Sequence, residues 1–313
     1  MLYPRILLSI TAAVAFVPYV AHAATEQKFE RTLNVTGTPS VVVETGSGDV
    51  HVVVGSSNQV TVMGKVHSGH WGWGNGGDDK LVQQIVQNPP IHQSGNAIEI
   101  KESNSGESWT KSLFNGHNIS IDYDITVPKG TDLKATSGSG NVRVEGVSGP
   151  LRGETGSGDV VASGILGDSQ LETGSGNIHV QNASGTLKLN TGSGDIRVTQ
   201  STIRDTKAET GSGNIELDAV QGPLRAETGS GDITAKGMPN ADWYLQTGSG
   251  NIDLTIPPST KFTLDARSDS GSIKSDLPLT MQGDMSKRHI HGTVNGGGST
   301  VRAESGSGDV RIH

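Results

Sequence analysis

Residues Leu171–Val180 read LETGSGNIHV, and near copies of this stretch begin 18 residues before it and 18 residues after it. From Gly138 to Gly248, the first glycine of the copies recurs in steps of 18 or 19 residues. A period this constant predicts a solenoid in which each period forms one coil. The strict form, TGSG followed by Asp or Asn and then by Val or Ile, begins at Thr45, Thr155, Thr173, Thr191, Thr210, Thr228 and Thr247. Looser copies begin at Ser137, Ser268 and Ser305.

Each period alternates apolar and polar residues, which is typical of half-buried β-strands. In the quoted copy, Leu171, Ile178 and Val180 would face inward, while Glu172 and His179 would face solvent. A second group of turn-forming residues lies about half a period away from each GSG. We therefore predict an all-β, single-domain β-solenoid of the parallel β-helix kind, with coils of roughly 18 residues and two or three strands per coil.

The glycines of each GSG lie where the chain must turn between two strands. We expect them to adopt positive φ, and we expect stacked corners to leave little room for Cβ atoms.

The residue that follows each GSG alternates between amide and carboxylate. Stacked coils would place these side chains about 4.8 Å apart, and an unbroken aspartate column would set like charges side by side. Interleaved asparagines remove that repulsion and offer an amide donor to the neighbouring carboxylates. We therefore interpret these residues as a structural ladder: Asn141, Asp159, Asn177, Asp195, Asn214, Asp232 and Asn251.

Two further columns are expected from the same stacking. The threonines Thr173, Thr191 and Thr210 could form a hydroxyl ladder. An outer column, also interpreted as a structural ladder, consists of Glu154, Glu172, Asn190, Glu209, Glu227 and Gln246.

Residues 1–23 have the features of a signal peptide: Arg5, an apolar run over Ile6–Val17, and the small-x-small sequence Ala21-His22-Ala23. We predict that residues 24–313 form the β-solenoid domain, with irregular opening coils and an insertion over 24–136 and regular repeats and the C-terminal end over 137–313. The chain should be exported to the periplasm, the exterior or the cell surface, with no transmembrane span after the signal is removed.

The insertion contains one expected helix, Asp78–Gln87, ended by Pro89-Pro90, which would cover an exposed end or edge of the solenoid. Strands are expected over residues 40–54, 59–66, 97–101 and 119–127. The final motif runs into Val310 and His313, and we expect its strand edge to need cover from residues 277–299 or from a partner.

Composition limits the possible functions. The chain has no cysteine, which excludes disulfides, thiolate metal sites and a cysteine nucleophile. Its net charge is −8 without clusters of Lys or Arg, which argues against nucleic acid and anionic lipid as partners. The 44 glycines and the 4% aromatic content could indicate disorder, but the regular alternation of Val, Ile and Leu favours an ordered repeat.

Few residues suggest a binding site. Trp71 and Trp73, in the glycine-rich stretch HSGHWGWG, are the best candidates for surface recognition, because an exposed aromatic ring supplies a large contact area. His67 and His70, and separately His289 and His291, could contribute metal ligands, but neither pair completes a set. We predict no catalytic residue, no metal site and no cofactor.

The chain resembles the bacterial putative-adhesin family of uncharacterised secreted β-strand-repeat domains. The likeness covers roughly residues 29–313 and rests on SVVVETGSGDVHVVV, on the strand AIEIK, and on ISIDYDITVPKGTDLKATSGSGNVRV leading into the repeats. The resemblance implies a single-domain β-solenoid at the bacterial envelope or exterior and supplies no catalytic residues.

Three functional hypotheses follow. The first is a non-enzymatic structural, adhesive or surface-binding module whose partner is a surface, glycan or envelope component. The second is a calcium-binding protein similar to a β-roll, because GSGD resembles part of that repeat. The third is a carbohydrate-binding or carbohydrate-active β-helix protein.

Overall fold

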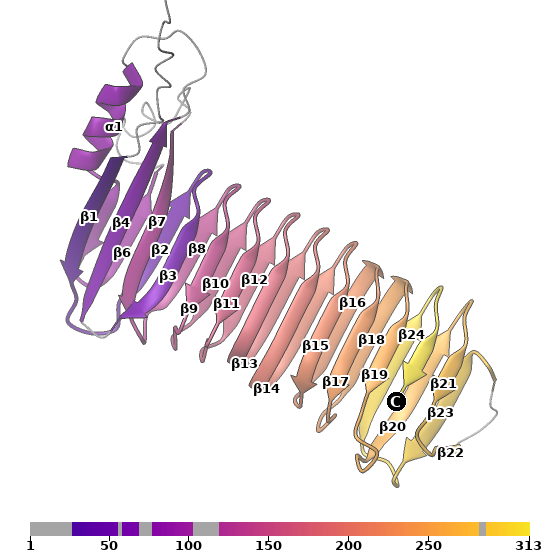
Figure 1. The fold of residues 1–313 in the computed structure, drawn as a ribbon. Helices are drawn as coiled ribbons and strands as arrows, with labels where there is room; N and C mark the ends of the chain where they lie inside the picture. The colour runs from indigo at the N-terminus through magenta and orange to yellow at the C-terminus, as the bar shows by residue number, and fades with distance from the viewer. Residues whose placement is uncertain (1–26, 56–57, 69–76, 103–118, 282–285) are drawn as a thin grey trace, which may run out of the picture.

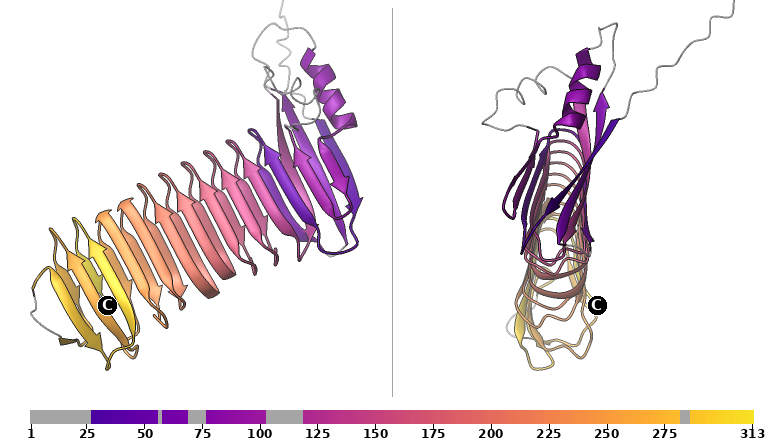
Figure 2. Two further views of the ribbon diagram at one scale, coloured as in Figure 1. Left: turned by 180° about the vertical axis from the view of Figure 1, so that it is seen from behind. Right: turned by 90° about the vertical axis from the view of Figure 1, so that its left-hand side faces the viewer.

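The computed structural model describes residues 27–55, 58–68, 77–102, 119–281 and 286–313. Within these ranges, 25 strands join into one hydrogen-bonded sheet that folds into two facing layers, and one helix lies at the N-terminal end (Figures 1 and 2). The predicted all-β solenoid is thereby confirmed.

Each regular coil contributes one strand to each layer, so a coil contains two strands. The strand Ser169–Thr173 (β12) lies in the first layer, and the chain turns at the GSG corner into β13 (Ile178–Thr191), which begins in the second layer. Leu171 pairs in parallel with Gly153 of the preceding coil and with Leu189 of the following coil. Each residue therefore lies beside the corresponding residue of the next repeat.

The first layer contains the strand that precedes each GSG corner. In spatial order its members are β5 (Ile91–Ser94), β6 (Ala97–Lys101), β2 (Ser40–Thr45), β8 (Asp132–Ser137), β10 (Leu151–Thr155), β12, the end of β13, the end of β14 (Ile196–Thr210), β16 (Leu224–Ser230), β18 (Trp243–Ser249), β24 (Ser299–Ser305), β20 (Phe262–Ser268), β23 (His289–Val294) and β22 (Thr280–Met281).

The second layer contains the strand that follows each corner. In spatial order its members are β1 (Gln27–Asn34), β4 (Gln59–Ser68), β7 (Ile119–Pro128), β3 (Val50–Gly55), β9 (Val142–Glu145), β11 (Val160–Ser163), the start of β13, the start of β14, β15 (Ile215–Val220), β17 (Ile233–Gly237), β19 (Ile252–Thr255), β25 (Val310–Ile312) and β21 (Ile273–Ser275).

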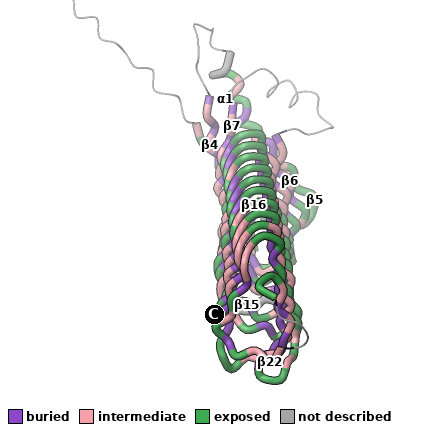
Figure 3. Tube along the Cα trace, turned by 90° about the vertical axis from the view of Figure 1, so that its right-hand side faces the viewer, coloured by how far each residue is buried: buried purple, intermediate pink, exposed green. Residues whose placement is uncertain are grey.

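The core lies between the two layers and runs the length of the stack (Figure 3). Alternate residues of each strand are buried in it, as in β12, where Ser169, Leu171 and Thr173 are buried. Most of its members are Val, Ile, Leu and Ala, whose removal from water supplies the main stabilisation in a chain without disulfides. The largest buried side chain is Trp243, whose indole N–H donates to the Gly222 carbonyl at 3.0 Å.

Antiparallel strands close the N-terminal end of the stack. β1 pairs with β4, β4 with β7, and β5 with β6, whereas the repeats themselves pair in parallel. The helix α1 (Gly77–Gln87) contacts β1 and β4 and buries Val82 and Ile85. The Arg31 guanidinium donates to the Gln87 carbonyl at 2.9 Å at the end of the helix. The helix thus covers this end of the stack (Figure 1).

The C-terminal end has an order in space that differs from its order in the sequence. β24 pairs with β18 on one side and with β20 on the other, and β25 lies likewise between β19 and β21. Residues 299–312 therefore form a coil inserted between two earlier ones, and the C-terminus lies within the stack in Figure 1. The edge of the last motif is covered, but by β20 and β21 and not by residues 277–299 as expected; within that segment, β23 covers β20 instead.

The expectation of positive φ at the corner glycines is wrong. The glycines with φ between +20° and +160° include Gly146, Gly164 and Gly185 at the second turns, and no GSG corner glycine is among them. Crowding explains the corners instead. A Cβ on Gly194 would lie 1.9 Å from the Gly176 carbonyl oxygen of the preceding coil, and Gly176 has the same relation to Gly158.

We predict that Gly194→Ala destabilises the stack by about 2 kcal/mol or more, because the new methyl group must push two coils apart. Urea denaturation followed by circular dichroism measures this change. Gly130→Ala is the matched control, since no atom lies within 4 Å of the added Cβ. Equal urea midpoints for the two variants would contradict the crowding explanation.

Candidate functional site

The Asp and Asn column bonds each coil to the next through side-chain oxygens and backbone N–H groups. The Asp159 N–H donates to Asn141 Oδ1 at 2.9 Å, the Asn177 N–H to Asp159 Oδ1 at 2.7 Å, and the Asp195 N–H to Asn177 Oδ1 at 2.9 Å. The same bond continues at Asn214, Asp232 and Asn251 over 2.7–2.9 Å. The Asn177 amide also donates to Asp159 Oδ1 at 3.2 Å.

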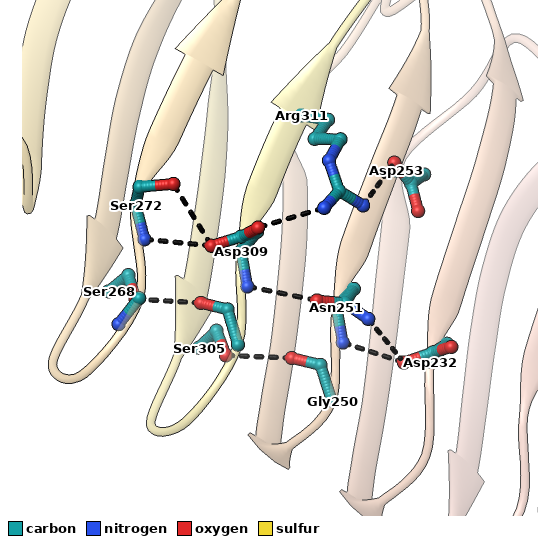
Figure 4. A network of polar contacts seen from close by, with 11 residues as sticks. Asp232, Gly250, Asn251, Asp253, Ser268, Ser272, Ser305, Asp309 and Arg311 are labelled. Carbon is teal, nitrogen blue, oxygen red and sulfur yellow. Dashed lines mark hydrogen bonds and ion pairs between the residues drawn. The ribbon is translucent and has the colours of Figure 1, made fainter.

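This column is directional and ends in different residues. At its start, Asp122 Oδ1 accepts from the Asp49 N–H at 2.9 Å, and His67 Nε2 lies 2.9 Å from Asp122 Oδ2. At its other end, Asp309 Oδ1 accepts from the N–H and the hydroxyl of Ser272, as Figure 4 shows. These bonds lower the pKa of Asp309. In the repeats, the Asp or Asn side chain at this position accepts an N–H of the next coil. The Ser272 hydroxyl instead donates to Asp309 of the neighbouring coil.

A second column, of Thr and Ser hydroxyls, lies inside the corners. The Thr173 hydroxyl donates to the Gly158 carbonyl at 2.8 Å and accepts from the Gly176 N–H at 3.1 Å. Thr191 makes the equivalent bonds to Gly176 and Gly194. The hydroxyls therefore bond to the backbone of adjacent corners, which satisfies buried polar groups.

Glu102, which directly follows β6, lies at the start of this column. Its carboxylate accepts from the Thr45 hydroxyl at 2.7 Å and from the Gly46 N–H at 2.9 Å. Elsewhere backbone carbonyls fill these positions, as where the Gly138 N–H donates to the Thr45 carbonyl. Burial raises the pKa of Glu102, opposed by the two hydrogen bonds, and nearby Asp122 raises it further.

The outer face of the first layer, from β8 to β24, carries two parallel columns of side chains and is called here the striped face. Register places the first column at Lys134, Arg152, Gln170, Lys188, Lys207, Arg225, Tyr244 and Arg302. Two residues further along each strand, the second column contains Thr136, Glu154, Glu172, Asn190, Glu209, Glu227, Gln246 and Glu304.

Side chains of the two columns pair within single strands. Arg152 pairs with Glu154 and Arg225 with Glu227, and Lys207 Nζ lies 2.8 Å from Glu209 Oε1. The sequence predicted that these glutamates stack as a ladder from coil to coil. Glu154, Glu209 and Glu227 instead form an ion pair with a cation on the same strand. This pairing uses the i, i+2 spacing that puts both side chains on one face.

Tyr244 is an aromatic residue of the striped face that is only partly buried. The guanidinium carbons of Arg225 and Arg302 lie 4.7 Å and 5.9 Å from its ring centroid. Its hydroxyl donates to Gln246 Oε1 at 2.6 Å. The ring is therefore held between two cations, with its polar tip fixed.

Two shallow grooves lie on the striped face. The first groove, of about 520 Å³, crosses β8, β10, β12 and β13, and its lining includes Asp132, Lys134, Pro150, Arg152, Asp168 and Lys188. The second groove, of about 400 Å³, crosses β13, β14, β16 and β18, and its lining includes Asn190, Glu209, Glu227 and Gln246. Both volumes fall within the range of ligand-binding clefts.

A third groove, of about 440 Å³, lies at the second-turn edge of the stack and is mostly apolar. Val220, Ile256, Pro257 and Pro258 contribute to its lining, beside Met238, which is 42% exposed.

The other residues considered from the sequence lie apart from these grooves or cannot be placed. Trp71 and Trp73 lie outside the described residues, as does His70. His289 lies on β23 and its Nε2 is 3.2 Å from Asp265 Oδ1. Within the described ranges, no three His, Asp or Glu side chains form a group suited to holding a metal ion.

Sequence reasoning missed the first column of the striped face. Its signal is present in the repeats as Arg-x-Glu, Lys-x-Asn and Lys-x-Glu just before the GSG corners, as in Arg152-Gly-Glu154. The grooves could not be found this way, because they depend on neighbouring strands.

A family model, described as Toastrack DUF4097, matches residues 71–313. The chain belongs to the Toastrack DUF4097 family. The resemblance drawn from the sequence is thereby confirmed. None of the curated proteins compared with the chain is similar to it.

Solved structures similar to this member of the family come from several bacteria. A putative adhesin from Bacteroides fragilis has 13% identity and a TM-score of 0.41, with 93% of this chain and 99% of that chain covered. A putative lipid binding protein from Parabacteroides distasonis has 15% identity and a TM-score of 0.44, with 93% and 98% covered. A putative cell adhesion protein from Clostridium sporogenes has 11% identity and a TM-score of 0.23, with 92% and 99% covered. Such similarity of fold does not transfer a function.

We predict that Asn177→Asp destabilises the stack by about 1 kcal/mol at pH 7, because it creates three successive carboxylates at 159, 177 and 195. Acidification should restore stability relative to the unmodified chain. Urea midpoints at pH 7 and pH 4 measure both effects. Asp159→Asn keeps the acceptor oxygen without adding charge and serves as the control; an equal loss in both variants would contradict the repulsion argument.

Glu102→Gln tests the carboxylate cap. Because the pKa of Glu102 is raised in the folded chain, folding favours its protonated form. Its contribution to stability is therefore present at low pH and is lost as pH rises through the folded-state value. We expect the variant, which keeps only one of the two acceptor oxygens, to gain less stability than the native chain on acidification from pH 7 to about pH 4.5.

The half-exposed Glu99, on β6 beside Lys101, supplies the matched control Glu99→Gln. Urea midpoints across this pH range are compared for all three chains. An unchanged pH dependence in Glu102→Gln would show that Glu102 is not the titrating cap.

Proposed function

We propose that this protein is a non-catalytic binding module that holds an extended polymer, an envelope or surface glycan, on its striped face. The observation that carries the proposal is the register of the first layer, which repeats donors and acceptors in straight columns at intervals of about 4.8 Å. A polymer with a regular array of hydroxyl groups offers a donor and an acceptor at each repeat. A rigid, preformed face lowers the entropic cost of binding such a chain.

The charge of the striped face supports a neutral or weakly charged partner. From β8 to β24 the two columns contain six cations and five carboxylates. Ion pairs between neighbouring columns, as at Arg302 and Glu304, neutralise much of this charge locally. This face therefore has no large patch of one charge that would attract a densely charged polymer.

A binding role accounts for the carboxylates better than catalysis does. Glu154, Glu209 and Glu227 pair with cations, and the buried Glu102 caps the inner hydroxyl column. In the Asp and Asn column, one oxygen of each bonded carboxylate accepts a backbone N–H, as in Asp159, which supports a structural role over calcium binding.

We further propose that the chain is exported from the cytoplasm. Residues 1–23, interpreted as a signal peptide, lie outside the described residues, and residues 24–313 would form one domain in the periplasm or at the cell exterior. Among the described residues, no helical segment combines the length and the apolar content that crossing a bilayer requires.

Affinity electrophoresis of the purified protein through gels that contain neutral or anionic polysaccharides tests the proposal. We expect retardation by a neutral polysaccharide, unchanged by a calcium chelator and without release of reducing ends. The double variant Arg225→Ala with Glu227→Ala should weaken retardation about tenfold. The matched control, Arg197→Ala with Glu216→Ala, removes an ion pair from the outer face of the second layer and should leave retardation unchanged.

Equal losses in the two double variants would contradict the assignment of the striped face. Release of reducing ends would reopen the carbohydrate-active hypothesis, and retardation that required calcium would reopen the calcium-binding one.

A further inference from the structure

The two grooves of the striped face meet at a single strand. The first groove lies toward the second-turn edge and includes Lys188, and the second lies toward the GSG corners and includes Asn190. Of the strands that line the grooves, β13 alone contributes to both. A ligand that occupied both grooves would therefore have to pass over β13.

The strands on either side of β13 carry bridges between the two columns. On β12, the Gln170 amide donates to Glu172 Oε1 at 2.5 Å, and on β14, Lys207 Nζ lies 2.8 Å from Glu209 Oε1. On β13 the corresponding residues are Lys188 and Asn190, both exposed. Lys188 and Asn190 carry no pair of opposite charges, and each lines one of the two grooves, so this strand is where a ligand could pass from one groove to the other.

We propose that one polysaccharide chain crosses the striped face diagonally, entering along the first groove, passing between Lys188 and Asn190, and leaving along the second groove. This inference rests on the proposed glycan-binding function and adds the path and the residues that define it. From β8 to β18 the path crosses six strand spacings, about 29 Å along the stack.

The lining of the path selects a neutral chain rich in hydroxyl groups. In the first groove, the cations Lys134, Arg152 and Lys188 face the carboxylates Asp132 and Asp168. Asp168 Oδ1 accepts from the Thr186 N–H at 2.8 Å. This bond lowers the pKa of Asp168, so the carboxylate stays ionised to a lower pH than that of an ordinary aspartate. In the second groove, two carboxylates lie between the amides Asn190 and Gln246. Donors and acceptors of both kinds are thus available along the whole path.

Asn190→Glu closes the path, because a glutamate at this position repeats the pairing seen on β14 and bridges to Lys188. Asn190→Ala removes the amide but leaves the path open. Thr199→Glu adds the same charge two residues from Arg197 on the outer face of the second layer and is the control for net charge.

Isothermal titration calorimetry measures the affinity of each full-length chain for neutral oligosaccharides longer than about 29 Å and for short fragments of the same sugars. Urea midpoints first show that the variants are as stable as the native chain. We expect the native chain to bind the long oligosaccharide about tenfold or more tightly than the fragments. Asn190→Glu should remove this advantage of length. Asn190→Ala should weaken binding, because an amide of the second groove is lost, but should keep the advantage of length, and Thr199→Glu should change neither.

The possible failures are distinguishable. A length advantage that survives in Asn190→Glu, or equal affinity for long and short sugars in the native chain, would overturn the diagonal path and leave the glycan-binding function in place. Absence of binding to every neutral sugar, or binding of an unfolded polypeptide such as reduced casein in their place, would overturn both.

Discussion

The close approach of stacked corners is the constraint on which the rest of the structure depends. From Gly140 onward, the second glycine of each GSG corner lies against the carbonyl of its counterpart one coil away, at a separation that leaves no room for a side chain. This approach holds neighbouring coils at the strand spacing, so that the backbone, the hydroxyl column and the Asp and Asn column all bond in one register. A side chain in place of the second glycine at a single corner would therefore weaken the backbone bonds, the hydroxyl column and the Asp and Asn column together.

The same register produces the striped face. Residues two apart on a strand point outward together, and parallel stacking repeats them in every coil. Charged residues therefore collect into straight columns without any dedicated loop or cleft. A change at a single position, such as asparagine at 190 where most coils have glutamate, then alters the pattern of charge on this face at one coil alone.

The regular part of the fold could be predicted from the sequence, because local pattern determines it. The alternation around Leu171 and Glu172 assigns each side chain to the core or to solvent, and the recurring GSG marks each coil. The φ angles of the corner glycines were predicted wrongly, since glycine suits both positive φ and close backbone approach. Glu102 could not be recognised as a cap, because its partner Thr45 lies 57 residues away and no repeated motif joins them. The inserted position of β24 and β25 was also beyond prediction, because every copy of the motif matches every other well enough to stack on it.

Because of the inserted coil, the last coils lie in the stack in a different order from that in which the ribosome makes them. From β8 to β19, each coil lies directly against a coil that precedes it in the sequence. Residues 262–275 come next in the sequence, but in the finished stack they pair with β24 and β25 and not with β18 and β19. Residues 299–312, the last to be made, therefore occupy the place between these two coils. A chain that ended before residue 299 would therefore lack the strands that pair with β18 and β19 in the complete stack, and its final coils could not take their native neighbours.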